Sequence, residues 1–217
     1  MRQFLAVAFT TACLTTAAHA SLIATLDGGP TGSSPFTYTY GVTLSGDERL
    51  DPAATNGATC PGPGSTAVQC NPPGTFFTIY DVGGFQSAGL APNAPTGWGF
   101  TDQLVGITPS TINGSVFDNP SLVNVTFFYT GPVVDGNGVD QHFTGFLINS
   151  TDSNLVPSTF TSQSTKNVDS QSGLTDQVVG PIVVPGGGGG GVPEPATMGL
   201  IGAGLSGLAL LRRKRSS

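Results

Sequence analysis

The amino-acid sequence predicts an all-β fold, an antiparallel β-sandwich with long turns. Hydrophobic residues recur with a period of two rather than 3.6, which is typical of strands that bury one face. The chain has 32 glycines and 17 prolines among 217 residues, and these residue types favour turns. No interior segment shows a convincing helical period. Helices are expected only at the two ends, as an N-terminal signal helix and one short C-terminal transmembrane helix.

The clearest strand covers residues 36–44. Every even position there is aromatic or aliphatic, and every odd position is threonine or glycine. Residues 123–130 alternate in a similar way. Shorter candidate strands cover residues 22–26, 76–82, 104–107, 142–148 and 178–184. Roughly seven or eight strands with turn signals between them favour an antiparallel sandwich.

The segment from Asp135 to Asp140 contains Asn137-Gly138, a pair that supplies the positive φ angles of a tight turn. It predicts a hairpin that joins residues 133–134 to the strand through Phe143. The same segment offers oxygen ligands for calcium, but its fifth position is Val139, where an EF-hand requires Asp or Asn. The hairpin accounts for the segment without an ion.

The first 20 residues have the organisation of a secretory leader. Arg2 gives a positive start, residues 4–14 are uncharged and largely apolar, and Ala18-His19-Ala20 forms an A-x-A pattern before Ser21. This order predicts a signal peptide at residues 1–20, cleaved between Ala20 and Ser21. A first buried strand or helix of the fold is the alternative, but it would not require these three features in this order.

An uncharged apolar stretch covers residues 196–211 and is followed at once by Arg212, Arg213, Lys214 and Arg215. As a helix it would be about 24 Å long, slightly short of the roughly 30 Å hydrocarbon core of a bilayer. The arginines can extend to the interface, so a short transmembrane helix is predicted. The cations favour a cytoplasmic C-terminus, with the rest of the chain outside. A soluble amphipathic helix would need a polar stripe, which this stretch lacks.

Val192, Pro193, Glu194 and Pro195 stand directly before the apolar stretch. The order of Pro-Glu-Pro, short apolar helix and basic C-terminal end resembles the PEP-CTERM sorting signal of Gram-negative bacteria that produce exopolysaccharide. The resemblance covers residues 192–217. It implies recognition by an exosortase, a membrane-embedded transpeptidase-like enzyme that would cut near the Pro-Glu-Pro. It also implies an exported protein of the cell envelope or cell surface, transiently anchored in the inner membrane.

Six glycines at residues 186–191 predict a flexible linker, which leaves residues 21–185 as one sandwich domain ahead of the sorting tail. Five of the seven basic residues and one of the thirteen acidic residues lie outside that domain. The domain therefore carries two basic and twelve acidic residues, a net charge of −10. Attraction of nucleic acid by charge is excluded for such a domain.

Cys60 and Cys70 are the two cysteines that remain once the leader, with Cys13, is removed. The segment between them has two prolines and two glycines, so a disulfide is expected to staple it. A zinc site is the alternative. Two thiols and His142, the one histidine of the domain, cannot complete tetrahedral zinc coordination. No metal ion or other cofactor is therefore predicted.

Little in the sequence indicates an enzyme. His142 would have to carry any catalytic triad, and Asp140, two residues away on the same strand face, is the candidate hydrogen-bond partner for it. A polar strand residue beside a hairpin is the favoured interpretation of His142, because neither a nucleophile motif nor an oxyanion loop accompanies it. The leading hypothesis is a non-enzymatic surface or matrix protein that works by adhesion or by association with exopolysaccharide. The alternative is a surface carbohydrate-active hydrolase, or a module that binds carbohydrate or calcium. A hydrolase predicts a groove with two facing carboxylates.

Overall fold

The computed structural model describes residues 21–52, 59–61, 67–69, 74–109, 111–112, 116–168 and 171–187. These residues form thirteen strands and no α-helix, which confirms the all-β prediction. The strands are β1 (Leu22–Thr31), β2 (Phe36–Leu44), β3 (Glu48–Leu50), β4 (Thr59–Pro61), β5 (Ala67–Gln69), β6 (Phe76–Val82), β7 (Phe85–Leu90), β8 (Trp98–Gln103), β9 (Val123–Tyr129), β10 (Val134–Asp135), β11 (Gln141–Ser150), β12 (Leu155–Lys166) and β13 (Thr175–Pro185).

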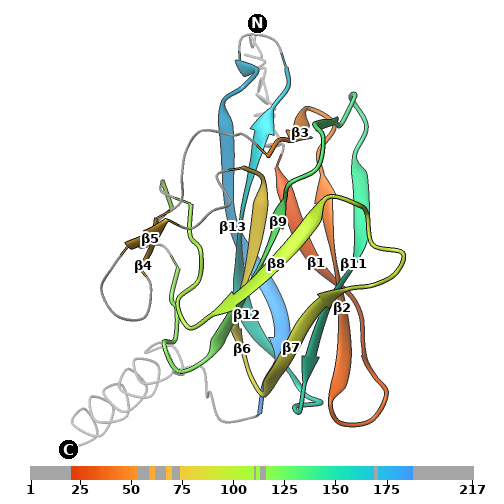
Figure 1. Ribbon diagram of the computed structural model, residues 1–217, viewed down its shortest axis with the longest axis vertical. Coiled ribbons are helices and arrows are strands. Elements are labelled where there is room, and N and C mark those ends of the chain that lie inside the picture. Colours follow the sequence, from red (N-terminus) through yellow and green to blue (C-terminus); the bar gives the residue numbers. More distant parts are fainter. Residues whose placement is uncertain are drawn as a thin grey trace, which may run out of the picture.

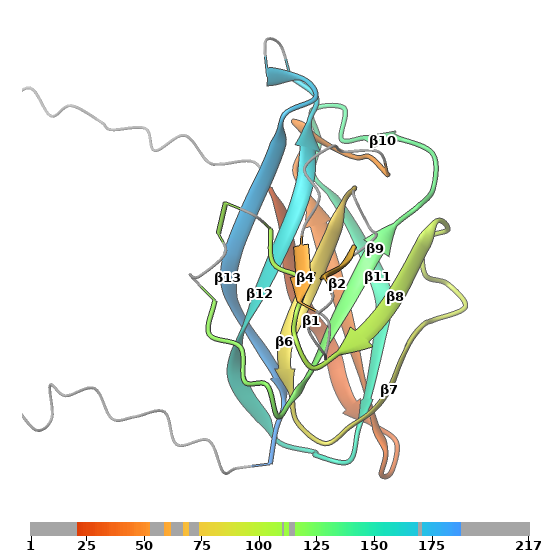
Figure 2. The same cartoon turned by 60° about the vertical axis from the view of Figure 1, so that its left-hand side comes forward.

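Two antiparallel sheets make up most of the fold (Figures 1 and 2). The first sheet has the strand order β1-β2-β11-β7. The second sheet has seven strands, in the order β10-β3-β12-β6-β9-β8, with β13 paired to the other edge of β12. The short strands β4 and β5 pair only with each other.

One hydrophobic core lies between the two sheets, and both contribute to it. In β2 the side chains of Tyr38, Tyr40, Val42 and Leu44 are all fully buried, as the alternation in the sequence predicts. An aromatic cluster from the second sheet comprises Phe77, Trp98, Phe127 and Tyr129. Phe146 of the first sheet packs into this cluster, so the cluster joins the two layers.

Residues 104–107 form no strand, so that sequence prediction is wrong. They belong to a connection between β8 and β9 that lies on the outer face of the second sheet. The backbone carbonyl of Ile107 accepts hydrogen bonds from the hydroxyl groups of Thr78, Tyr80 and Thr161, at 2.8, 2.9 and 3.2 Å. The face of the sheet presents side-chain hydroxyl groups to this segment and no free strand edge. The segment is therefore held by hydrogen bonds from side chains and not by backbone pairing with a neighbouring strand.

The predicted hairpin at residues 133–143 is also wrong. Asn137 and Gly138 do have positive φ angles, of 53° and 76°. However, β10 pairs with β3 in the second sheet, whereas β11 pairs with β2 and β7 in the first. The turn therefore carries the chain from one sheet to the other. The prediction of a tight turn with positive φ angles at Asn137 and Gly138 is correct, but a turn sequence does not determine which strands pair.

β13 runs along the long axis of the molecule, and its two ends define two ends of the fold (Figure 1). At the distal end, a connection of residues 167–174 joins β12 to β13, beside the β2–β3 and β10–β11 connections. At the exit end, β13 finishes at Pro185 and the chain leaves toward its C-terminus. No helix in the described ranges is long and apolar enough to cross a membrane. The predicted helices at residues 1–20 and 196–211 lie outside those ranges.

Candidate functional site

Most residues predicted for sorting and processing lie outside the described residues. This applies to Ala20, to Cys70, to the motif at 192–195 and to the basic end at 212–215. Ser21, the predicted first residue after cleavage, is described and is 3% exposed. Its backbone nitrogen donates to Ser45 Oγ at 3.1 Å, and the backbone nitrogen of Ser45 donates to the Ser21 carbonyl at 3.1 Å. The described fold is thus held from Ser21 onward.

Cys60 lies in β4, where it pairs in register with Val68 of β5. This antiparallel pair brings Thr59 opposite Gln69, the residue before Cys70. The disulfide between Cys60 and Cys70 remains a prediction, because Cys70 is not among the described residues.

The chain leaves the domain through a tight backbone clamp at the exit end. Gly83 donates its backbone N–H to the Pro185 carbonyl at 2.8 Å, and Gly186 donates to the Asn154 carbonyl at 3.1 Å. A Cβ on Gly186 would lie 2.4 Å from a methyl carbon of Val156, so only glycine fits there. The first glycine of the run at 186–191 therefore still packs against the domain.

A hollow of about 410 Å³ lies beside this clamp and contains the carboxylates of Asp81 and Asp152 in its lining. Asp81 Oδ1 accepts the backbone N–H of Asn119 at 2.9 Å. Asp81 has a positive φ of 60°, a conformation that Asp tolerates better than most residues. Burial raises the pKa of Asp81, and nearby Asp118 adds to this increase, while the hydrogen bond from Asn119 opposes it.

At the opposite, distal end, three connections surround a polar pocket of about 450 Å³, which we call the distal pocket. The β2–β3 connection and β3 provide Gly46, Asp47 and Arg49; β10 and the loop after it provide Asp135, Asn137 and Gly138; the β12–β13 connection provides Asn167, Val168 and Ser172. Backbone hydrogen bonds join these connections. Gly138 donates to the Gly46 carbonyl at 2.8 Å, and Asn167 donates to the Asp47 carbonyl at 3.0 Å.

Asp140 acts as a structural residue beside this pocket, and no calcium-ligand role is shown for it. Its Oδ1 atom accepts the backbone N–H of Gly46 at 3.0 Å, which fixes the β2–β3 connection against the turn before β11. Among the described residues there is no group of three or more His, Cys, Asp or Glu side chains placed to hold a metal ion.

Both basic residues of the domain, Arg49 and Lys166, lie at the distal end. Arg49 Nη2 is 3.0 Å from Asp51 Oδ2. Lys166 Nζ lies 3.4 Å from Glu48 Oε1 and 3.6 Å from Asp176 Oδ2. Lys166 therefore links the end of β12 to β3 and to β13, whereas the Arg49 pair stays local to β3 and the residue that follows it. The last two residues of β12 pair in register with Arg49 and Glu48.

Glu48 is the one fully buried carboxylate of the described residues. Burial raises the pKa of Glu48 to about 7, and Asp176 adds to this increase, while the side chains of Ser164 and Lys166 oppose it. A carboxylate in this position has a high cost when it is ionised.

The hydrogen-bond partner of His142 is Asp27, and the alternative contact with Asp140 is not formed. His142 Nε2 lies 2.9 Å from Asp27 Oδ2, and Nδ1 lies 3.0 Å from Thr43 Oγ1. Asp27 is on β1 and His142 on β11, so the pair spans the intervening strand β2. Burial works to raise the pKa of Asp27, but hydrogen bonds from Thr144, His142 and Thr25 hold it below its ordinary value.

Gly41 of β2 makes room for this pair, and we expect Gly41→Ala to separate it. A Cβ on Gly41 would lie 2.1 Å from Asp27 Oδ2 and 2.7 Å from His142 Cε1. The expected loss is about 1 kcal/mol in the free energy of unfolding, since the pair is partly exposed. Denaturant unfolding of Gly41→Ala should be compared with Gly89→Ala in the same sheet, where a Cβ meets nothing within 4 Å. Equal stability of the two variants would contradict this role.

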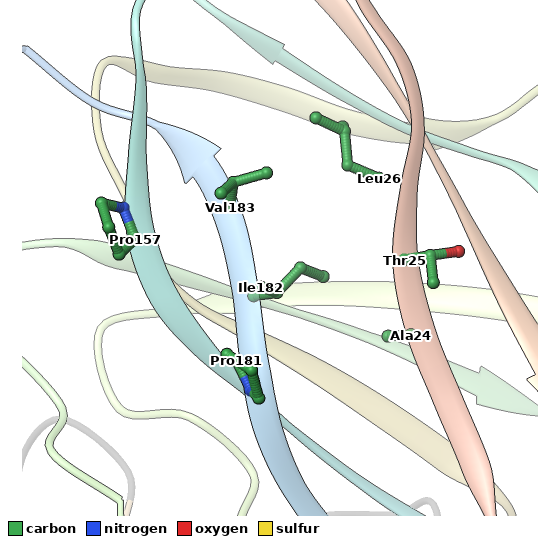
Figure 3. A pocket seen from close by; sticks show the side chains of 7 residues that line it. All are labelled: Ala24, Thr25, Leu26, Pro157, Pro181, Ile182 and Val183. Atoms are coloured by element: carbon green, nitrogen blue, oxygen red, sulfur yellow. The ribbon is translucent and has the colours of Figure 1, made fainter.

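An apolar groove of about 470 Å³ lies where the edge strands of the two sheets, β1 and β13, meet. Figure 3 shows Leu26 of β1 and Val183 of β13 pointing toward one another across it. Pro157 and Pro181 also line the groove. Prolines lack an N–H donor, which protects a sheet edge from pairing with another chain. The groove is therefore best explained as the guarded edge of the fold.

The described geometry defines an all-β domain with a clamped exit at one end and a polar pocket at the other. Residues 191–215 match the family model for the PEP-CTERM protein-sorting motif. The chain is thus an exported, envelope-associated protein that carries a PEP-CTERM motif and is processed by an exosortase-type membrane enzyme. No curated protein matches the chain.

Sequence reasoning missed the distal pocket, because its lining comes from three connections far apart in the chain. One signal was available. Both basic residues of the domain lie next to acidic or amide residues, in Asp47-Glu48-Arg49 and in Lys166-Asn167. Such pairs indicate a local charge network in a chain that is otherwise poor in cations.

Proposed function

We propose that the folded domain is a non-enzymatic surface or matrix protein that associates with secreted polysaccharide. The sorting motif at residues 191–215 carries this proposal, because it directs the chain to the envelope of a cell with an exosortase. The use of polar residues supports it. His142 binds Asp27 across the first sheet, and the two cations bind carboxylates within the distal network.

The proposed processing begins at the N-terminus and ends with release of the tail. The leader is removed between Ala20 and Ser21, and the helix at 196–211 holds the chain in the inner membrane with its basic end in the cytoplasm. The exosortase then cuts near Pro193-Glu194-Pro195. The disulfide between Cys60 and Cys70 forms after export. The clamp at Gly83 and Gly186 suits such processing, because it fixes the place where the tail leaves the domain.

Replacing Pro193, Glu194 and Pro195 together by alanine is expected to abolish tail removal. Wild-type protein should lose both leader and tail and leave the membrane fraction, whereas the variant should stay in the membrane with its full C-terminus. Intact mass and cell fractionation measure this. A host without its exosortase should reproduce the variant's result, and Ser216→Ala/Ser217→Ala should be processed normally. Retention of residues 196–217 by the wild type would show a permanent anchor instead.

Association with polysaccharide is tested with the mature protein purified from its host. It should co-sediment with the extracellular polysaccharide of the same culture. The same result is expected for newly secreted polysaccharide and for polysaccharide that has accumulated in the culture. Absence of binding would remove the matrix role while leaving the sorting route intact.

A surface carbohydrate-active hydrolase is the second candidate, and the hollow at the exit end is the observation that favours it. Asp81 and Asp152 both line this hollow, and the raised pKa of Asp81 is a property of general acids. Release of new reducing ends from the polysaccharide, lost in Asp81→Asn, would support this candidate over the first.

A further inference from the structure

Lys166 is the one lysine of residues 21–185, and its ammonium group lies between two carboxylates at the distal end. Its Nζ atom is 3.4 Å from Glu48 Oε1 and 3.6 Å from Asp176 Oδ2. The Glu48 side chain is 0% exposed, and the side chains of Lys166 and Asp176 are 16% and 17% exposed. A potential amine nucleophile and two carboxyl groups therefore meet where little water reaches them.

The pairing of three neighbouring strands holds these side chains on one face of the second sheet. Lys166 of β12 lies opposite Glu48 of β3 in the register. Asp176 of β13 lies opposite Ser164, which is two residues before Lys166 and so shares its face. Glu48 in turn is two residues before Leu50, a member of the core between the sheets. Regular backbone pairing thus positions the three groups at the distal end of the core.

The two carboxylate oxygens of Asp176 have different surroundings. Oδ1 accepts the backbone N–H of Gln177 at 3.1 Å. Oδ2 is buried and accepts no hydrogen bond from the described residues, and Lys166 Nζ lies 3.6 Å from it. A backbone donor on Oδ1 can stabilise the negative charge that develops there when a nucleophile attacks the carboxyl carbon. Oδ2 is then the oxygen that can depart.

Glu48 is suited to carry protons between the other two groups. Lys166 Nζ donates a hydrogen bond to Glu48 Oε1. Burial raises the pKa of Glu48 to about 7, so near neutral pH this group both accepts and releases protons. Burial acts to lower the pKa of Lys166, but Asp176 and Glu48 outweigh it, so the neutral amine is a minor form. A reaction that each chain undergoes only once can proceed slowly through that form.

We propose that Lys166 and Asp176 condense to an isopeptide bond, with Glu48 as the catalytic proton carrier. Nζ bonds to the carboxyl carbon of Asp176, and the bond from that carbon to Oδ2 breaks. Of the three protons on the ammonium group, one stays on the amide nitrogen and two leave with Oδ2 as water. Glu48 relays these protons and ends in its starting protonation state. The two opposite charges cancel in the neutral amide, so the reaction needs no oxidant and no further reactant.

Burial and fixed geometry both favour this condensation. An ion pair with little access to water is costly, and the neutral amide removes both charges. Groups that are held in contact also react at a high effective concentration. The bond would join the distal ends of β12 and β13 by a link that reducing agents do not cleave. The structure describes the chain before this reaction, and the pKa values of Glu48 and Lys166 belong to that form of the chain.

The test is intact mass and tryptic mapping of the mature protein after reduction of any disulfide. The bond lowers the mass by one water molecule. Arg49 and Lys166 are the only basic residues of the domain, and acylated lysine is not cut by trypsin. The linked chain should therefore be cut after Arg49 alone, and fragment spectra should join Lys166 to Asp176. Loss of water by cyclisation at an Asp-Gly step would leave cleavage after Lys166 intact.

Variants separate the roles of the three groups. Lys166→Arg keeps the cation but lacks the amine, so it should show no loss of water. Asp176→Asn should still form the bond, with ammonia as the leaving group, and should reach the same final mass as the linked wild type. Glu48→Gln should slow the reaction at least about a hundredfold, since glutamine cannot relay protons. Asp47→Asn is the matched control, because it removes a negative charge near Lys166 and none of the reacting groups.

A wild-type mass without loss of water, after prolonged incubation of the folded protein at neutral pH, would overturn the proposal. Loss of water that persists in Lys166→Arg, or that occurs equally in urea-denatured chains, would also overturn it, because the reaction depends on the folded site. A branch that joins Lys166 to Glu48 would contradict the roles assigned to the two carboxylates. None of these outcomes bears on sorting or on association with polysaccharide.

Discussion

Replacing Phe146 by alanine is expected to lower the free energy of unfolding by about 4 kcal/mol. Phe146 is fully buried and comes from the first sheet. Its ring centroid lies 5.0 Å from those of Phe77 and Trp98 and 5.1 Å from that of Phe127, all in the second sheet. Alanine would leave a cavity at the contact between the layers, and backbone pairing on both sides limits how far the cavity can collapse.

Phe100→Ala is the matched control for this prediction. Phe100 is 40% exposed and contacts the same cluster only through Phe127, at 6.3 Å. We expect it to cost about 1 kcal/mol, because much of its ring is already in water. Denaturant unfolding followed by tryptophan fluorescence measures both variants, since Trp98 is the single tryptophan. A loss no larger for Phe146→Ala than for Phe100→Ala would show that the cluster does not hold the sheets together.

The domain is expected to be more stable at about pH 5 than at about pH 8, through Glu48. The pKa of Glu48 is raised from 4.5 to about 7 in the fold, so the folded state binds a proton more tightly than the unfolded chain. The stability that this proton contributes is complete below about pH 4.5 and is lost as the pH rises through about 7. The difference amounts to at most about 3 kcal/mol.

Asp27 and Lys166 act in other pH windows. The lowered pKa of Asp27 contributes stability above its ordinary value of 3.8, and this contribution is lost as the pH falls below that value. Lys166 has a raised pKa: burial acts to lower it, but Asp176 and Glu48 outweigh burial. Its contribution is lost only as the pH rises above its ordinary value of 10.5. Glu48 therefore acts in the neutral range without overlap from these two.

Glu48→Gln separates this effect from all other titrations. Glutamine keeps the shape of the side chain but cannot ionise, so the variant should lose the stability difference between about pH 5 and pH 8. At the higher pH it should be more stable than the wild type. Thermal and denaturant unfolding at both pH values provide the measurement. A variant that is less stable than the wild type at the higher pH would mean that the Lys166 pair outweighs the cost of burying the charge.

The sequence predicted strands well where one face is apolar. β2 and β6 have the predicted bounds, because most of their buried positions are aromatic or aliphatic. It missed β12, the strand with the most residues, because Thr161–Thr165 reads as a polar loop. These five residues are at most 1% exposed. Thr161, Ser162 and Gln163 form hydrogen bonds with distant groups, for example Gln163 Nε2 with the Gly74 carbonyl at 3.1 Å.

The contact between His142 and Asp27 was also beyond the sequence, since 115 residues separate them. β11 shows why. Its register on β2 shifts between Thr144 and Phe146, where Gly145 has a φ of 97°. This bulge inverts the alternation, so His142 faces the outer surface while Phe146 faces the core. Without the bulge at Gly145, a strict period of two would place the side chains of His142 and Phe146 on the same face of the sheet.

The sequence by itself determined the class of fold, the acidic charge of the domain and the sorting motif at its C-terminus, because each depends on residues close together in the chain. Alternation, composition and a short linear motif need no knowledge of distant contacts. Only the tertiary structure decided which strands pair, that Glu48 is buried beside Lys166, and that three separate connections enclose the distal pocket. Those outcomes depend on pairing between distant segments, and the free energy that selects them comes from burial shared by both sheets.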